Sequence, residues 1–203
     1  MNWFGMAVVA GIGYLLGAVP FAVIIGRACG VDVLKAGSGN PGATNVKRTC
    51  GKFAGNLCFV LDALKGAAAT GFPLYAPLFG VTFDGRTDYL CYAGLAAAIV
   101  GHSFSLFIGF RGGKGVATAI GGLLVIMWPV ILIGLAVWAL LFYATRYVSV
   151  ASLGMALSLP VSAGLVFSFS GAHFYVALAL AILIFVRHRS NIARLIQGRE
   201  NKF

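Results

Sequence analysis

The sequence predicts an all-α integral membrane protein with seven transmembrane helices. Of its 203 residues, 60% are hydrophobic and only 10% are charged, and the mean hydropathy is +0.95. A soluble domain of this size has too little interior to bury that much apolar surface. The apolar runs are also too long and continuous for the alternating strands of a membrane barrel, so helices are expected. We expect residues 1–203 to form a single transmembrane domain.

The first two apolar runs cover residues 3–26 and 53–79, and each is long enough to cross a bilayer core of about 30 Å. The first run lacks a basic leader and is interpreted as a retained span. The second contains Asp62 and Lys65, three residues apart and hence on one helical face. Charges within a span must face protein or water. A structural ion pair is at least as well supported here as a catalytic role.

The remaining spans follow from length and from one proline. The third run covers residues 89–110. A later apolar stretch of about thirty residues would make a helix of ~45 Å, too long for one crossing, so Pro129 is expected to divide it into two spans. The sixth and seventh spans are expected at residues 148–167 and 172–186. The tail that follows has the pattern of a basic amphipathic helix on the membrane surface.

The distribution of positive charge favours seven spans over six. With seven, the N-terminus lies outside, and all Lys and Arg residues except Lys65 and Arg86 share the cytoplasmic side. With six, the basic tail would face the opposite side. The net charge of +10 is therefore attributed to this bias and to anionic headgroups or substrates, and no nucleic acid partner is expected.

Residues 37–48, with the sequence GSGNPGATNVKR, form a candidate anion site in the first cytoplasmic loop. Glycines let the backbone approach a ligand closely and point its N–H groups into one concavity. Lys47 and Arg48 add positive charge, which suits phosphate. Neutral side-chain donors are supplied by Ser38, Asn40, Thr44 and Asn45. An ordinary polar turn with a basic flank is the alternative.

A second glycine-rich segment covers residues 111–118. It is not a nucleotide-binding P-loop, because that motif requires Gly at 108 and Ser or Thr at 115, where this sequence has Ile108 and Gly115. A glycine-rich turn that opens a helix still brings free N–H groups, the positive helix end and Lys114 together. The expected binding residues are Gly112, Gly113, Gly115 and Thr118. An ordinary basic turn at the membrane edge is the alternative. With five acidic residues and no metal-ligand spacing, we expect no metal and no cofactor.

The sequence offers no convincing covalent nucleophile. A Ser/His/Asp triad needs an acid to orient a histidine, and the cytoplasmic acids Asp32 and Glu200 lie in no motif for that role. Ser38, Ser149 and Ser152 suit ligand binding better.

Two histidines have different interpretations. His188 lies in the basic tail with Asn191 three residues later, on the same helical face. A solvated interfacial side chain is the alternative for His188. His102, at the end of the third run, is more typical of a buried structural histidine.

Three segments together closely resemble the motifs of the bacterial acyl-phosphate-dependent glycerol-3-phosphate acyltransferases, the PlsY type. They are GSGNPGATNVKR at 37–48, GHSFSLFIGFRGGKGVAT at 101–118 and RHRSNIARLIQGRE at 187–200. The stretch LDALKG at 61–66 is similar too. The order and spacing agree, and the one departure is Arg111, where the family often has Lys.

The resemblance implies transfer of a fatty acyl group from acyl phosphate to the sn-1 hydroxyl of glycerol 3-phosphate. The products would be lysophosphatidic acid and phosphate, in the first step of bacterial phospholipid biosynthesis. It implies catalytic roles for Ser38, Arg48, Lys114, His188 and Asn191. It also implies that Glu200 is structural, that the glycines around Lys114 bind glycerol 3-phosphate, and that Ser149 and Ser152 match the family's polar connection between spans five and six.

The expected partners are glycerol 3-phosphate, acyl phosphate and membrane lipid, with no obligate protein partner. The expected location is the bacterial plasma (inner) membrane, with the active site facing the cytoplasm. An organophosphate or anion transporter is the competing function, and it predicts ionisable or unwound elements near mid-membrane and often an inverted repeat. Here the cations gather at one face and no repeat is evident, so we expect the polar segments to share one site at the inner face.

Overall fold

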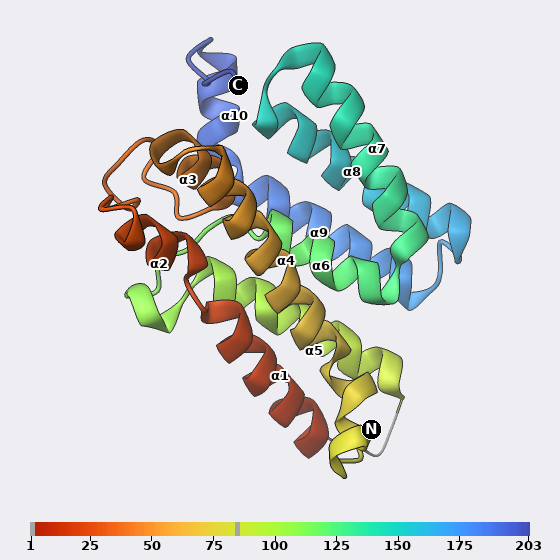
Figure 1. Ribbon diagram of the computed structural model, residues 1–203. Coiled ribbons are helices and arrows are strands. Elements are labelled where there is room, and N and C mark those ends of the chain that lie inside the picture. Colours follow the sequence, from red (N-terminus) through yellow and green to blue (C-terminus); the bar gives the residue numbers. More distant parts are fainter. Residues whose placement is uncertain (1–2, 84–85) are drawn as a thin grey trace. The chain divides into compact units, whose positions relative to one another are not determined.

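The computed structural model describes residues 3–83 and 86–203, and within these residues the protein is all-helical and contains no strand (Figure 1). The chain forms two compact units, Met1–Ile126 and Met127–Phe203. Unit 1 comprises α1 (Trp3–Ala18), α2 (Phe21–Ala28), α3 (Ala43–Cys50), α4 (Lys52–Tyr75), η1 (Ala76–Phe79), α5 (Thr87–Ser103), η2 (Leu106–Ile108) and α6 (Val116–Ile126). Unit 2 comprises α7 (Trp128–Thr145), α8 (Val148–Val166), α9 (Ala172–Arg187) and α10 (Arg189–Ile196).

The helices of unit 1 pack closely at glycines. Helix α1 lies against α5, and α4 lies against α5 and α6. A Cβ atom at Gly66 would stand 2.0 Å from the carbonyl oxygen of Thr118, and one at Gly101 would stand 2.2 Å from that of Tyr14. Small residues let apolar helices pack with their backbones in contact. Such close packing favours helix association in lipid, where the hydrophobic effect does not drive helices together. Larger side chains at these two positions would push α4 from α6 and α5 from α1.

The first apolar run forms two helices instead of one. Helix α1 ends at Ala18 and α2 begins at Phe21, because Pro20 has no N–H and cannot continue a helix. Two carbonyls at the end of α1 find donors elsewhere in unit 1. Ser105 Oγ donates to Ala18 O over 2.5 Å, and Lys65 Nζ donates to Val19 O over 2.8 Å. The break is thus stabilised by side chains from α4 and from the loop after α5.

Helices lie along the predicted apolar runs in order, but they differ in length. In the described part of the chain, four segments are long and apolar enough to cross a membrane: Trp3–Ala28, Lys52–Phe79, α7 and α8. Helices α9 and α10 add a fifth if the pair, bent by 58°, counts as one span. Helix α5 has 17 residues and α6 has 11. The predicted division near Pro129 is confirmed, since α6 ends at Ile126 and α7 begins at Trp128.

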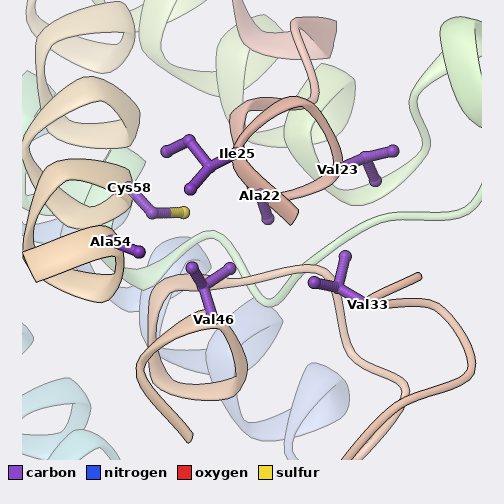
Figure 2. Packing of buried hydrophobic residues seen from close by; sticks show 7 residues of the cluster. All are labelled: Ala22, Val23, Ile25, Val33, Val46, Ala54 and Cys58. Atoms are coloured by element: carbon purple, nitrogen blue, oxygen red, sulfur yellow. The ribbon is translucent and has the colours of Figure 1, made fainter. Parts of the chain in front are cut away.

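The first loop is held on unit 1 by a small apolar core. Seven buried side chains from α2, the loop, α3 and α4 make up this core, and Figure 2 shows them: Ala22, Val23, Ile25, Val33, Val46, Ala54 and Cys58. Val46 is 0% exposed and Val33 is 1% exposed. Burying a valine side chain contributes roughly 1.5–3 kcal/mol. The loop is therefore an ordered part of the unit.

Unit 2 is a layer of three helices with a folded tail. Helix α8 packs against α7 and α9, and α10 follows α9 after the bend at His188. The C-terminal residues return to the α7–α8 connection. Phe203 N donates to Arg146 O over 2.9 Å, and Lys202 Nζ lies 5.4 Å from the ring centroid of Tyr147. The predicted tail helix is present as α10, and its chain beyond Ile196 is fixed to α7 and α8.

Candidate functional site

Asn45 organises the first candidate loop from within. The residue is 1% exposed. Its Oδ1 accepts from Ser38 N over 2.9 Å, and its Nδ2 donates to the carbonyls of Val33 and Ala36, each over 3.0 Å. Asn45 therefore fixes the backbone that carries Ser38. The amide of Asn45 is bound within the loop and has almost no exposed surface, and the expectation that Asn45 binds substrate stays a prediction.

Gly37 makes the bond between Ser38 and Asn45 possible. Its φ is +60°, a region that side chains other than glycine rarely adopt. A Cβ atom there would stand 2.3 Å from Asn45 Oδ1. The glycine thus gives both the turn and the room for the asparagine.

Within residues 37–48, the exposed polar and charged side chains belong to two residues with predicted catalytic roles. Ser38 and Arg48 are exposed, and Asn40 and Thr44 are half-buried. Arg48 lies in the last turn of α3, and Thr44 lies in its first turn. An exposed hydroxyl and an exposed guanidinium on an ordered loop are suited to bind an anion from the aqueous phase.

The second glycine-rich segment is a turn that opens α6, as predicted. Gly115 has φ +80° and directly precedes Val116, the first residue of α6. Gly113 N donates to His102 O over 3.1 Å. Lys114 is half-buried between these two glycines. The turn therefore brings an ammonium group close to the N-terminus of a helix.

Thr118 lies at a packing contact between two helices. It is 0% exposed, and its carbonyl lies at the close contact between α6 and Gly66 of α4. Its Oγ1 has no hydrogen-bond partner among the described residues. The expectation that Thr118 binds substrate stays a prediction. Its position indicates a role in helix packing.

The predicted ion pair of the second run is present and buried. Lys65 Nζ lies 2.8 Å from Asp62 Oδ1, and the two residues are 6% and 2% exposed. His102, expected to be a buried histidine, is 8% exposed, and its Nδ1 lies 3.6 Å from the same oxygen. The sequence did not indicate this third member, because the contact joins α4 to α5.

In unit 2, Glu200 gathers the polar residues of the tail. Its Oε1 accepts from Ser149 Oγ over 3.0 Å and from Asn191 Nδ2 over 2.6 Å, and its Oε2 accepts from Arg194 Nε over 2.7 Å. Burial raises the pKa of Glu200, but these hydrogen bonds outweigh it and hold the pKa below its ordinary value. The carboxylate thus orients Asn191 and links α10 to α8.

His188 lies at the bend between α9 and α10 and is 3% exposed, so the alternative of a solvated side chain is wrong. Its Nδ1 lies 2.8 Å from the carbonyl oxygen of Ile184. A carbonyl only accepts, so Nδ1 carries the proton, and Nε2 is the basic nitrogen of the neutral ring. Asn191 N donates to His188 O over 2.8 Å, which fixes the two residues to one turn.

Ser149 and Ser152 both lie on α8 with partners of their own. Ser149 donates to Glu200, and Ser152 Oγ accepts from Trp138 Nε1 over 3.3 Å. The two serines are 4% and 3% exposed. Their contacts indicate that they hold the tail and α7 in place.

Known proteins resemble the chain over nearly its full length. The family model described as glycerol-3-phosphate acyltransferase matches residues 7–198. The glycerol-3-phosphate acyltransferase of Rhodospirillum rubrum is 44% identical over 97% of this chain and 90% of its own length. That of Endomicrobium trichonymphae is 42% identical over 94% of this chain and 92% of its own.

Solved structures agree with this. Crystal structures of PlsY, an integral membrane glycerol 3-phosphate acyltransferase, in its glycerol 3-phosphate and lysophosphatidic acid forms are 37% identical to this chain. Their TM-scores are 0.86 and 0.84, and each match covers 98% of this chain and 95% of theirs. The all-helical fold, the apolar helices and these matches agree, and the chain belongs to the glycerol-3-phosphate acyltransferase family.

Proposed function

We propose that this chain transfers a fatty acyl group from acyl phosphate to the sn-1 hydroxyl of glycerol 3-phosphate. The products are lysophosphatidic acid and phosphate. The observation that carries the proposal is the turn Gly112–Gly115 at the start of α6, where Lys114 and backbone N–H groups suit a phosphate ester. The PlsY structures in glycerol 3-phosphate and lysophosphatidic acid forms support the choice of substrate and product.

The cations and donors of unit 1 bind the two phosphates of the reaction. Lys114 and Arg48 carry the positive charge. Ser38 lies on the loop that Asn45 fixes, where its hydroxyl and the loop N–H groups orient the acyl carbonyl and stabilise the charge that develops on its oxygen. Asn40 and Thr44, both half-buried beside Ser38, add neutral donors.

Acyl phosphate is already activated, so no covalent acyl-enzyme is needed. The hydroxyl oxygen of glycerol 3-phosphate attacks the acyl carbon, the bond from that carbon to the phosphate oxygen breaks, and phosphate leaves with the electron pair. The hydroxyl proton goes to His188 Nε2 or to a substrate phosphate. Asn191, held by Glu200, orients the hydroxyl.

We further propose seven spans, with the N-terminus outside and the catalytic residues on the cytoplasmic side of the bacterial inner membrane. Helices α5 and α6 then supply the two short spans. The bias of Lys and Arg residues supports this orientation. Both units act as one enzyme, since the family match extends from residue 7 to residue 198.

The test is product formation by the purified protein in detergent. With acyl phosphate and glycerol 3-phosphate we expect lysophosphatidic acid and an equal amount of phosphate, and with acyl-coenzyme A as donor we expect none. Lys114→Ala should raise KM or abolish turnover, whereas Lys52→Ala, an exposed cation at the start of α4, should have little effect. Absence of product from acyl phosphate, or full activity of Lys114→Ala, contradicts the proposal. The transporter alternative has no support from the relatives.

The role of His188 has its own test. His188→Gln removes the basic Nε2 and keeps a polar side chain of similar length. If Nε2 accepts the proton, kcat falls by about 10²–10⁴-fold. Full activity of His188→Gln would assign the proton to the substrate phosphate.

A further inference from the structure

Unit 1 contains a buried charged cluster that the proposed mechanism does not use. Asp62, Lys65 and His102 come from α4 and α5, and none is more than 8% exposed. Lys65 Nζ lies 2.8 Å from Asp62 Oδ1, and His102 Nδ1 lies 3.6 Å from the same oxygen. Ionisable groups so deep among apolar helices are costly to bury, and they mark functional positions more often than inert ones.

The other edge of the His102 ring contacts the turn that carries Lys114. A Cβ atom at Gly113 would stand 2.2 Å from His102 Nε2, so the imidazole lies directly against this glycine. Gly113 N donates to His102 O over 3.1 Å, and a Cβ atom at Gly112 would stand 2.2 Å from that carbonyl. His102 thus lies between the Asp62 carboxylate and the Gly112–Gly113 turn.

Lys65 connects the cluster to the break between α1 and α2. Its Nζ donates to Val19 O over 2.8 Å and lies 5.7 Å from the ring centroid of Phe21. A small pocket joins these parts, and its walls include Asp62, Lys65, His102, Pro41 of the first loop, Gly112 and Gly113. The charged cluster therefore lies where the helix break, the first loop and the Gly112–Gly113 turn meet.

We propose that Asp62, Lys65 and His102 are positioning residues that hold the Gly112–Gly113 turn, and with it Lys114, in the geometry that binds a phosphate. Lys65 pairs with the carboxylate, the carboxylate lies 3.6 Å from Nδ1 of the imidazole, and the imidazole ring and its backbone carbonyl contact the turn. N–H groups held in place before a ligand arrives stabilise an anion without reorganisation. The identity of the ligand rests on the proposed function, whereas the link to the turn does not.

Hydrogen–deuterium exchange of the purified protein tests the link without any substrate. In His102→Leu we expect the amides of residues 109–115 to exchange about tenfold faster than in the wild type, because the turn loses its support. His102→Asn, whose amide can still donate toward Asp62, should lie between the two. Thr70→Val is the matched control, since Thr70 is a buried polar residue of α4 whose Oγ1 donates to Gly66 O in its own helix.

A kinetic cycle tests whether the cluster acts through Lys114. His102→Leu should raise the KM of the same substrate as Lys114→Gln, by about tenfold or 1.4 kcal/mol, with kcat within about threefold of wild type. Because both changes disturb one turn, the double variant should be no more than about threefold worse than Lys114→Gln alone. Thr70→Val should leave KM unchanged.

Each result decides a different question. The inference is overturned if the exchange rates at residues 109–115 are unchanged in His102→Leu, or if Thr70→Val increases them equally. It is also overturned if the increases in KM from His102→Leu and Lys114→Gln multiply fully in the double variant. If the wild-type protein makes no lysophosphatidic acid, the proposed function fails, and the exchange experiment still decides whether the cluster positions the turn.

Discussion

The amide of Asn45 offers the sharpest test of how the first loop is built. Asn45→Ala removes three hydrogen bonds, from Ser38 N and to the carbonyls of Val33 and Ala36, at a residue that is 1% exposed. At about 1 kcal/mol for each bond, the loss of stability is about 3 kcal/mol. The main cause of this loss is unpaired backbone groups and not a cavity. The carbonyls of Val33 and Ala36 lose their donor, and Ser38 N loses its acceptor, within an irregular loop.

The measurement is thermal unfolding in detergent, combined with turnover. Asn45→Ala should lower the unfolding temperature and also the turnover, since Ser38 loses the bond that places its backbone. The matched control is Asn56→Ala, an exposed asparagine on α4, which should change both by little. The reasoning is refuted if Asn45→Ala is as stable as Asn56→Ala, or if it is unstable but retains full activity in the fraction that remains folded.

Three further perturbations follow from the structure. Gly113→Ala places a Cβ atom 2.2 Å from His102 Nε2, so turnover should fall at least about tenfold. Normal kinetics of this variant would show that the turn can shift to make room for the methyl group. Lys65→Met should lower the free energy of unfolding by about 3–5 kcal/mol, because Asp62 is left buried without its cation. Asp62→Asn combined with Lys65→Met should restore part of that stability. Melting temperatures measure both variants, and equal losses in the two would contradict the ion-pair argument. Because the pKa of Glu200 is lowered in the folded protein, its contribution to stability is complete above the ordinary pKa of a glutamate and is lost as the pH falls through the folded value. Glu200→Gln should therefore unfold earlier than wild type at pH 7 and show a flatter loss between about pH 5 and 3; parallel pH curves would contradict the assignment.

Much of the helical layout could be predicted from the sequence because apolar runs and a proline mark it. Pro129 divides α6 from α7 as expected, and the glycines before Val116 open α6. The break at Pro20 escaped prediction because hydropathy continues unchanged across it, and its stability depends on Lys65 and Ser105 from distant parts of the chain.

The candidate site was less predictable where residue type alone does not reveal a partner. An asparagine in a glycine-rich loop suits a ligand as well as a backbone carbonyl, and the structure assigns Asn45 to the backbone. Thr118 lies in the first turn of α6, where it is buried against α4 despite its polar side chain. The contact between His102 and Gly113 is tertiary, so residue type alone does not indicate it.

The division of the first run at Pro20 has a consequence for biosynthesis. The donors for the carbonyls of Ala18 and Val19 are Ser105 and Lys65, which lie 87 and 46 residues later in the chain. Both donors are therefore synthesised after the carbonyls that they bind. Until α4 and the residues after α5 have been inserted, the nascent segment lacks both internal partners, so its native bend is completed only late in translation.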